Sequence, residues 1–434
     1  MTNKLNILIF GATGFTGQYA VVEMAKLAKE FNITWGVSGR SMDKLKSLLE
    51  WASEKTGEIS VKEVPIIIAD VKDEAALSTM AARTQVLVNC CGPYRHFGAP
   101  VVKACVENKT HYVDVSGEPF FMEKMQLEYN QQAKDQGVYV VSACGFDSIP
   151  ADLGIVHLKH IFNGQLNSVE SYLSGKAHKP RGENEASIHY GTWESAVYGL
   201  GLAADLTPLR RSLYSEKLPR FSPPLKARSV LHKNLDGQWC LPFPGADRSV
   251  VYRTQRHSYF SNKERPVAMH AYIAFDGLYA ALVVMLTGAV FSLLTKFKFG
   301  RNLLLRYPRF FSGGFISHEG PGEDFMNHTE FFMKFIAQGW TQKLPNVDEE
   351  YTTAPDKTVV AQISAFNPGY GFTVTALLLS AITVLREPTT LPPSGGVYTP
   401  GVAFENTSLF NQLTRHGMKF EVLSDSSLGS KAKL

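Results

Sequence analysis

The feature that most constrains the fold is a run of glycines near the start of the chain. An apolar, β-branched-rich stretch at 6–10 predicts a strand buried on both faces. A GxxGxxG turn follows it, and residues 18–30 then have helical apolar spacing. Glycines let the backbone approach a pyrophosphate, whose charge is stabilised by the amides at a helix start. We therefore predict a dinucleotide site rather than a tight turn without a ligand, with cofactor contacts at Gly11, Thr13, Gly14, Phe15, Thr16 and Gly17.

The next predicted strand, 34–40, ends in Ser38, Gly39 and Arg40. An acidic residue at this position would bind the adenosine ribose hydroxyls and repel a phosphate. A guanidinium is the usual partner of a 2′-phosphate instead. The sequence thus favours NADP(H) over NAD(H), with Ser38 and Arg40 at the cofactor. The alternative is that Arg40 is a solvated charge.

Strand-like and helix-like segments alternate through the first 150 residues. This pattern predicts an α/β fold with a doubly wound parallel sheet of the Rossmann type. Ligands of such sheets lie beyond the carboxyl ends of the strands. We expect Asp70 near the adenine and the turn Cys91, Gly92, Pro93 and Tyr94 near the nicotinamide. The further strand-like runs end at residues 70, 94, 118 and 146.

Hydride transfer to a carbonyl or conjugated alkene requires alignment and one proton donor. Tyr94 is the first candidate because it follows the strand expected to reach the nicotinamide. Asp147 and Ser148 are alternatives at the neighbouring strand end. No Tyr-x-x-x-Lys pair occurs in a suitable place, which argues against the short-chain dehydrogenase route.

The bulk composition excludes several classes of protein. A chain of 434 residues favours two domains, and a net charge of +4 is too weak to indicate nucleic acid binding. Five cysteines form no CxxC pair and no zinc spacing, so no metal site is predicted. Adjacent Cys90 and Cys91 could sense redox state, although buried thiols are the simpler interpretation.

Beyond residue 150 the pattern changes to partly alternating strands. It predicts a second α+β domain with a mainly antiparallel sheet, followed by a helix near 373–387. A proline-rich stretch, 201–248, reads as a long irregular connection of the kind that covers active sites. The predicted domains are 1–150, 151–390 and a C-terminal segment, 391–434, and the strands of the second are 169–175, 250–259, 267–275 and 358–366.

A second candidate site lies at Gly191 and Thr192, where a helix is predicted to begin. Amides and a hydroxyl at a helix start suit a substrate carbonyl or carboxylate. Equally, Thr192 could only cap the helix. We interpret His189 as structural.

Residues 277–295 contain no charged side chain. As a helix this segment would measure about 28 Å, which is long enough to cross a membrane. Insertion is marginal on composition, because glycines, Thr287 and Ser292 interrupt the apolar run. A span would also separate the C-terminal segment from the first domain. Small residues on one face of this helix are predicted to pack on protein, and bulky ones on another face to contact lipid. The small face is Gly277, Ala281, Val284, Gly288 and Ser292, and the bulky face is Leu278, Leu282, Met285, Leu286 and Leu293.

Cations and aromatic residues alternate directly after this run, with no acid before Glu319. This composition suits a phospholipid headgroup layer. Monotopic attachment through 277–311 is the favoured interpretation, and a helix buried in the second domain or at a homodimer interface is the alternative. The cations are Lys296, Lys298, Arg301, Arg306 and Arg309, and the aromatic residues are Phe297, Phe299, Tyr307, Phe310 and Phe311.

Long motifs along the chain closely resemble the saccharopine dehydrogenase-like oxidoreductases of animals. They include IFGATGFTG, VNCCGPYRHFGAPVVKAC, YVDVSGEPFF, GFDSIPADLG, GTWESAVYG and GGVYTPGVAF. The resemblance implies a Rossmann domain, a second α+β domain and a C-terminal segment that packs back on the first. It also implies association with lipid droplets or organelle membranes. More distantly, the sequence is similar to the mycobacterial trans-acting enoyl reductases, which reduce a lipid-bound double bond.

These observations predict an NADP(H)-dependent reductase of a carbonyl or enoyl group on a lipid-like substrate at a membrane or droplet surface. A non-catalytic NADP(H)-binding scaffold or sensor on droplets is the alternative. Saccharopine oxidation is less favoured, because recognition of three carboxylates needs several cations. Arg95, beside Tyr94, is predicted to supply one substrate contact, and no basic cluster in the second half of the chain supplies the rest.

The predicted location is the cytosolic face of a lipid droplet or organelle membrane. Ala432, Lys433 and Leu434 resemble the Ser-Lys-Leu peroxisomal address, which leaves the peroxisome open.

Overall fold

The computed structural model describes residues 4–183 and 185–426. The peroxisome-like ending at 432–434 lies outside the described residues. The chain forms two units. The first comprises Met1–Phe146, Ala203–Leu213 and Gly369–His416, and the second comprises Asp147–Leu202, Tyr214–Pro368 and Gly417–Leu434.

This grouping differs from the expected domain boundaries in three segments. The first unit also contains 203–213, and its C-terminal part begins at Gly369 rather than at residue 391. The last described strand, β16, belongs to the second unit, where it pairs with β14. Each segment belongs to the unit whose hydrophobic surface or sheet it completes. The composition along the chain does not predict this assignment.

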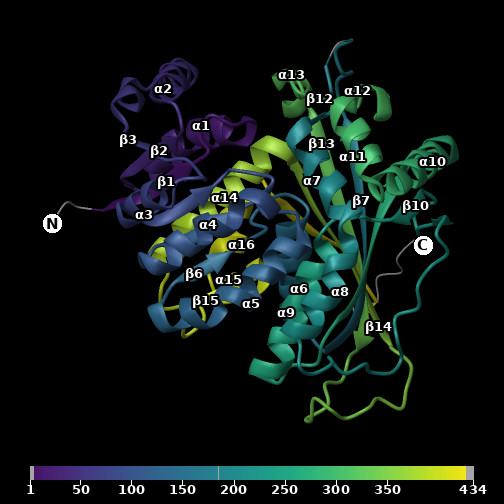
Figure 1. Cartoon of the computed structure of the whole chain (residues 1–434). Helices are drawn as coiled ribbons and strands as arrows, with labels where there is room; N and C mark the ends of the chain where they lie inside the picture. The colour runs from purple at the N-terminus through teal and green to yellow at the C-terminus, as the bar shows by residue number, and fades with distance from the viewer. Residues whose placement is uncertain (1–3, 184, 427–434) are drawn as a thin grey trace. The chain divides into compact units, whose positions relative to one another are not determined.

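The first unit is built on a sheet of seven strands, all parallel (Figure 1). The order β15-β6-β5-β4-β1-β2-β3 contains the doubly wound arrangement with its reversal between β1 and β4. β15 comes from the C-terminal segment and extends the sheet at β6. The strands are β1 Leu5–Phe10, β2 Trp35–Gly39, β3 Ile66–Ile68, β4 Thr84–Asn89, β5 His111–Asp114, β6 Tyr139–Val141 and β15 Gly396–Tyr398.

Helices cover this sheet. α14 (Thr373–Arg386) is apolar around most of its circumference and is buried against α1, β4 and β5. It confirms the helix predicted near 373–387. The other helices of the unit are α1 Phe15–Glu30, α2 Met42–Thr56, η1 Ile59–Glu63, α3 Glu74–Ala82, α4 Tyr94–Glu107, α5 Pro119–Gln136, η2 Ala203–Asp205, α8 Leu206–Leu213, α15 Pro400–Phe404 and α16 Leu409–Arg415.

Ion pairs fasten the inserted segment 203–213 to the first unit. Arg210 donates two hydrogen bonds to the buried carboxylate of Glu123 on α5, at 2.8 and 2.7 Å. Asp205 pairs with Arg95 at the start of α4. A bidentate arginine–carboxylate contact is geometrically specific, so this segment has a defined place although it lies far from α5 in sequence.

The second unit contains a seven-stranded mixed sheet of order β16-β14-β13-β7-β11-β10-β9. β11 runs parallel to β7 and the other neighbours are antiparallel, which confirms the mainly antiparallel sheet. A separate two-stranded sheet joins β8 and β12. The strands are β7 Gln165–Ala177, β8 Ile188–His189, β9 His232–Lys233, β10 Trp239–Pro242, β11 Ala268–Phe275, β12 Ile316–Ser317, β13 Thr329–Trp340, β14 Lys357–Phe366 and β16 Lys419–Asp425.

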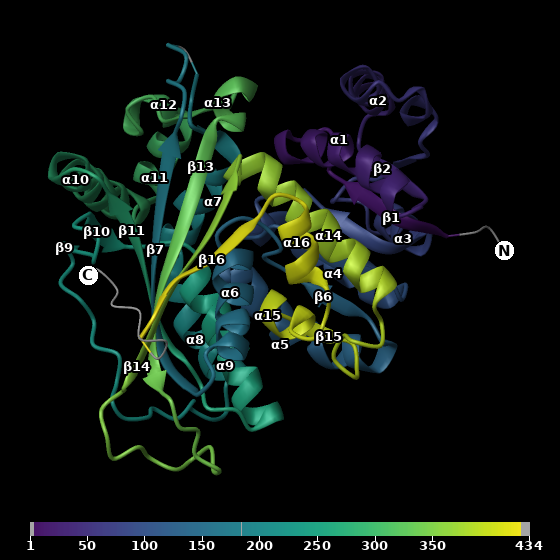
Figure 2. The same cartoon turned by 180° about the vertical axis from the view of Figure 1, so that it is seen from behind.

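α6 and α9 lie against the second sheet (Figure 2). A methyl group on Gly154 of α6 would lie 2.9 Å from Phe335 of β13, so glycine allows this close packing. The strand predicted at 250–259 is wrong, because these residues belong to α9. The helices are α6 Ser148–Ile161, α7 Tyr190–Gly201, α9 Asp247–Asn262, α10 Leu278–Thr295, α11 Lys298–Arg306, α12 Pro308–Phe311 and α13 Glu323–Asn327; η3, Pro368–Phe372, bridges the units in sequence.

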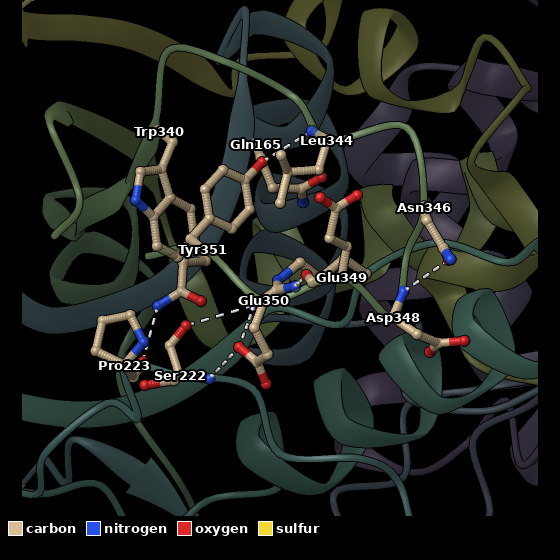
Figure 3. A network of polar contacts seen from close by, with 12 residues as sticks. Gln165, Ser222, Pro223, Trp340, Leu344, Asn346, Asp348, Glu349, Glu350 and Tyr351 are labelled. Carbon is tan, nitrogen blue, oxygen red and sulfur yellow. Dashed lines mark hydrogen bonds and ion pairs between the residues drawn. The ribbon is translucent and has the colours of Figure 1, made fainter. Parts of the chain in front are cut away.

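The long connection is partly ordered by a buried arginine. Arg265 donates to the carbonyl of Glu349 at 2.7 Å and pairs with Glu350, whose carboxylate also accepts the Ser222 amide at 3.1 Å. Nearby, Trp340 and Tyr351 stack with ring centroids 3.7 Å apart (Figure 3). Arg265 thus holds the loop around residue 222 against the 341–356 loop within the second unit.

Candidate functional site

The glycine turn packs too tightly for any side chain at two positions. Gly11 has a φ of 77° and donates its amide to the Ser38 carbonyl at 3.0 Å. A Cβ on Gly11 would lie 2.6 Å from the sulfur of Cys91, and one on Gly17 would lie 2.2 Å from the Gly11 carbonyl. The turn therefore brings the end of β1 against the turn after β4 and against the first turn of α1.

The N-terminus of α1 is open to an anion. Gly14 is the N-cap, no side chain caps the helix, and the first turn contains no acidic residue. Among the described residues, this helix start therefore carries neither an N-cap side-chain hydrogen bond nor a first-turn carboxylate that would compete with an anion. Thr13 and Gly14 are exposed. Uncapped amides with the positive end of the helix dipole are suited to a pyrophosphate.

The Phe15 ring borders this opening. It packs edge-on against Tyr370, with ring centroids 4.6 Å apart, and against Tyr19 at 5.4 Å. Edge-to-face aromatic pairs are favourable and directional. Phe15 therefore fixes the first turn of α1 against the C-terminal part of the first unit.

Arg40 is exposed directly after β2, and its charge reaches Cys91, where it opposes the rise of the thiol pKa. Within the described ranges, no acidic side chain forms an ion pair with Arg40. Asp70 also acts on Cys91, so the three side chains lie at one edge of the sheet. The exposed guanidinium therefore lies where the sequence analysis expects a 2′-phosphate, and its role in cofactor choice stays a prediction.

Ser38 occupies a different position from the one expected. Its side chain is fully buried and donates to the sulfur of Met80 at 3.1 Å. Its carbonyl accepts the amides of Gly11 and Ala12. Ser38 therefore supports the glycine turn through its backbone, and its buried hydroxyl is committed to Met80 rather than exposed at the predicted cofactor edge.

Asp70 follows β3 and has an intermediate exposure. Its carboxylate accepts the amide of Lys72 at 3.0 Å. This bond fixes the loop after β3 and leaves a carboxylate oxygen at the edge where the adenine was expected.

The turn after β4 is held by two side chains that the sequence analysis did not assign. Asn89 accepts the Cys91 amide at 3.0 Å. After the Gly92–Pro93 cis peptide, α4 begins, and Glu118 accepts the amides of both Tyr94 and Arg95 at 2.9 Å. The N-terminus of α4 is therefore occupied by an internal carboxylate, whereas that of α1 is open.

The hydroxyl of Tyr94 points into the first unit. The residue is buried, and the hydroxyl donates to the Asn89 carbonyl at 2.9 Å. Burial, with the nearby charge of Asp114, raises the pKa of Tyr94 well above its usual value. This geometry favours an anchoring role for Tyr94 over the predicted role as proton donor.

A buried hydrogen-bond chain supports the same edge of the sheet. Asn89 donates to the Tyr112 hydroxyl at 3.0 Å, which donates to Asp114 at 2.8 Å, and Ser142 also donates to Asp114 at 3.0 Å. Asp114 accepts the Ala143 amide as well. Burial raises its pKa to about 6 although these donors favour the charged form. Polar residues at the ends of β4 and β5 were the only signal of this network in the sequence.

Arg95 is not free. Its guanidinium forms the ion pair with Asp205 and lies over the Phe120 ring, 3.9 Å from the centroid. The predicted contact between Arg95 and a substrate would have to compete with these two partners.

Cys90 and Cys91 have intermediate exposure, but their thiol groups lie in a largely desolvated environment. Burial is the main cause that raises the pKa of Cys91 to about 12, and it raises the pKa of Cys90 further. Thiolates are the reactive form, so neither residue is prepared for redox chemistry near neutral pH.

Asp147 and Ser148 stand at the start of α6 in the second unit. Asp147 has φ 68° and ψ −65°, a conformation that is unfavourable for a residue other than glycine. Its carboxylate accepts from Ser148 at 3.0 Å and hydrogen-bonds to Asp247, the first residue of α9.

The two carboxyl groups compete for protons. Burial raises the pKa of Asp147 to about 6. Burial and the charge of Asp147 raise the pKa of Asp247 well above its usual range. One proton shared between two carboxylates is the expected result. Asp147 is the more exposed of the pair.

The N-cap of the helix at Gly191 and Thr192 is His189, and not Thr192 as the alternative interpretation expected. α7 begins at Tyr190, and the ring of His189 accepts the Gly191 amide at 3.0 Å. Thr192 is exposed. His189 is thus structural, as predicted, and it occupies an amide that was expected to face a substrate.

The predicted residues fall into two sets. All those assigned to the cofactor, with Arg95, belong to the first unit, and Asp147, Ser148, Gly191 and Thr192 belong to the second. Within residues 4–183 and 185–426, no group of three or more histidine, cysteine or acidic side chains could hold a metal ion.

A parallel doubly wound sheet with an open glycine turn at its switch point defines the first unit as a dinucleotide-binding unit. Residues 7–141 match the family described as the saccharopine dehydrogenase NADP binding domain.

Several known proteins are similar over nearly the whole chain. A human saccharopine dehydrogenase-like oxidoreductase is 40% identical and covers 98% of both chains. A protein of Caenorhabditis elegans named "Lipid droplet localized protein" is 37% identical and covers 98% of this chain and 100% of its own. The chain belongs to the saccharopine dehydrogenase-like oxidoreductases.

Two more distant likenesses were also found. A Mycobacterium tuberculosis protein that bears the name of a trans-acting enoyl reductase is 38% identical over 36% of each chain. The saccharopine dehydrogenase (L-Glu forming) of Saccharomyces cerevisiae has a TM-score of 0.55 at 14% identity, covering 97% of this chain and 100% of its own. The latter supports the fold alone.

Proposed function

We propose that this protein is an NADP(H)-dependent oxidoreductase that reduces a carbonyl or enoyl group of a lipid-like substrate at a lipid surface. The observation that carries the proposal is the open glycine turn with Arg40 beside it. In the part of the chain that the structure describes, the helix start has no side-chain cap and the Arg40 guanidinium has no acidic partner, which suits them to a pyrophosphate and a 2′-phosphate respectively. When bound, the nicotinamide supplies the hydride.

Asp147 is the best candidate for the proton donor. The residue has an intermediate exposure, and burial of its carboxyl raises the pKa of Asp147, which favours the protonated form that a proton donor requires. Asp247 donates a hydrogen bond to it and limits its rotation. Tyr94 is less suited, because its hydroxyl is committed to the Asn89 carbonyl.

The substrate class is inferred from the surface of the second unit and from the relatives. An exposed apolar helix, α10, offers contact with a lipid phase. One relative is named for lipid droplets and another, over part of its length, for enoyl reduction. Oxidation of saccharopine is disfavoured, since Arg95, the arginine predicted to contact the substrate, is paired with Asp205.

The cofactor is tested by fluorescence titration with NADPH and NADH. The wild type is expected to prefer NADPH, and Arg40→Ala to lose most of that preference, because about two charge-assisted hydrogen bonds disappear. Arg83→Ala, at an exposed arginine after α3, is the matched control. Failure to bind either nucleotide would refute the oxidoreductase proposal.

Turnover separates an enzyme from a scaffold. NADPH oxidation is followed with enoyl and carbonyl lipids in micelles, using wild type, Asp147→Asn and Ser215→Ala, an exposed serine, as control. We expect activity to fall about tenfold per pH unit above the pKa of Asp147 and to be lost in Asp147→Asn. Tight NADPH binding without turnover would instead support a cofactor-binding scaffold.

A further inference from the structure

Two stretches of the described chain are long and apolar enough to cross a membrane by length and composition: α10 and Pro368–Arg386. In the second stretch 78% of the residues are buried, as in a core helix, whereas in α10 only 11% of the residues are buried. α10 has 18 residues and would measure about 27 Å. It is therefore the apolar helix whose surface is left uncovered.

The strands on either side of α10 exclude a membrane span. β11 precedes the helix and pairs with β7, and β7 also pairs with β13, which follows the helix. Both ends of α10 therefore return to one sheet of the second unit. A helix crossing a bilayer would place these strands on opposite sides and break the sheet.

α10 packs on the protein through a different face from the one expected. Ala281 is buried as predicted, but Val284, Gly288 and Ser292 are exposed, and a methyl group on Gly288 would meet nothing within 4 Å. The inner face is bulky: Phe291 packs on Trp193 of α7 at 4.6 Å. The predicted small packing face is therefore wrong, because α7 and α11 receive large side chains.

The outer face of α10 is strongly apolar. Tyr279 is 82% exposed, Leu286 is 64% exposed, and Val290 and Leu293 are more than half exposed. Thr287, also on this side, satisfies its hydroxyl within the helix by donating to the Val283 carbonyl at 2.8 Å. The exposed face therefore presents little polarity to an apolar phase.

The next residues add positive charge and aromatic rings. Phe299 and Phe310 are 77% and 80% exposed. The guanidinium of Arg301 has a partner within the protein, because it donates to the Thr295 carbonyl at the end of α10 at 2.8 Å. The exposed cations are Lys296, Lys298, Arg306 and Arg309, and no acidic residue occurs between Asp276 and Glu319.

We propose that residues 278–311 form a docking surface that lies in one leaflet of an anionic phospholipid layer. The outer face of α10, with Phe299 and Phe310, enters the acyl region, and the four exposed cations bind lipid phosphates. Apolar burial and cation–headgroup attraction together give stable peripheral attachment. The proposal deepens the lipid-surface part of the proposed function and is independent of turnover.

Charge decides between a lipid layer and a second copy of this chain. A two-fold symmetric interface would bring the same patch of each copy together. Four cations without an acid between Asp276 and Glu319 would then face four others. Like charges at such an interface are unfavourable, whereas lipid phosphates complement them.

The test is vesicle flotation of the full chain with phosphatidylcholine alone or mixed with phosphatidylserine. We expect binding to the mixed vesicles that weakens with salt. Lys296→Ser with Lys298→Ser should weaken it about 30-fold, and Leu286→Ser with Leu293→Ser at least about tenfold. The matched control is Ile59→Ser with Lys62→Ser, which removes an exposed apolar side chain and a cation from η1.

Circular dichroism and NADPH titration establish that each variant is folded, so lost attachment is distinguishable from loss of the proposed function. Equal binding to neutral and anionic vesicles would overturn the role of the cations. Absence of vesicle binding by the wild type would overturn the proposal, as would a dimer that dissociates in the leucine variant.

Discussion

Substitution of Gly14 is expected to affect cofactor binding more than folding. Its φ of −73° suits any residue, and a methyl group would meet only the Gly11 carbonyl, at 3.3 Å. Gly14→Ala is expected to change the free energy of unfolding by no more than about 1 kcal/mol. Because the methyl group would stand at the open helix start, the Kd for NADPH should rise at least about tenfold, as measured by calorimetry.

Gly199→Ala is the matched control, since a methyl group there, on α7, meets nothing within 4 Å. Unchanged NADPH affinity in Gly14→Ala would mean that the cofactor does not approach this turn.

Asp114 gives the first unit a pH-dependent stability. Its folded pKa is raised to about 6 by burial, so the folded state binds more protons than the unfolded state between about pH 4 and 6. Its contribution is present below the unfolded pKa and is lost as the pH rises through the folded pKa. The loss is about 3 kcal/mol at most.

Urea unfolding from pH 4 to 7 measures whether the free energy of unfolding falls as the pH rises. Asp114→Asn should show a smaller fall in the free energy of unfolding than the wild type over the same range. An identical fall in both proteins would assign the dependence to other carboxyl groups.

The sequence placed residues near the site more reliably than it oriented them. The tight glycine turn and the position of Arg40 directly after β2 could be predicted, because both follow from the order of strand, turn and helix along the chain. Ser38 and Tyr94 were expected to face a ligand, yet both hydroxyls turn inward, toward Met80 and the Asn89 carbonyl. The direction of a side chain at a strand end depends on tertiary packing, which the local pattern does not contain.

At the scale of elements, the wrong prediction at 250–259 arose because the helical spacing of the apolar residues was not recognised. Residues 250–259 are rich in β-branched and aromatic side chains, which favoured a strand. The buried positions Val250, Val251, Thr254 and Ser258 instead follow helical spacing on α9. β13 was not predicted, although it lies in the middle of the second sheet and pairs with both β7 and β14.

The segment 203–213 is expected to depend on one buried ion pair. Arg210→Ala leaves the Glu123 carboxylate buried without its bidentate partner, and Glu123 is 1% exposed. Because the Arg210 side chain is itself partly exposed, we expect destabilisation of about 1–3 kcal/mol. Thermal unfolding measures it.

Arg211→Ala, at the exposed neighbouring position, should have little effect. Equal destabilisation by both variants would show that α8 helix propensity, and not the ion pair, is responsible.

At the scale of the whole molecule, the first unit cannot be taken from the first 146 residues alone. Such a fragment lacks β15, which extends the sheet at β6, and α14, which buries β4 and β5. We expect it to be insoluble or unable to bind NADPH. Joining residues 369–416 to the fragment through a flexible linker should improve both properties, as gel filtration and fluorescence titration would show.

A soluble, NADPH-binding fragment 1–146 would contradict this dependence. The sequence did predict that a C-terminal segment returns to the first domain, through the family resemblance. Its extent could not be predicted, because α14 is apolar on most sides and would suit the core of either unit.

The return of the C-terminal segment also has a consequence for biosynthesis. The ribosome completes β6 long before it reaches Gly369, where the final part of the first unit begins. At roughly 5–20 residues per second, the nascent parallel sheet waits on the order of ten seconds or more for α14 and β15. During that interval an apolar sheet face is uncovered while the exposed surface of α10 emerges. Chaperone binding to the nascent chain, or early engagement of a lipid surface, would protect it from aggregation.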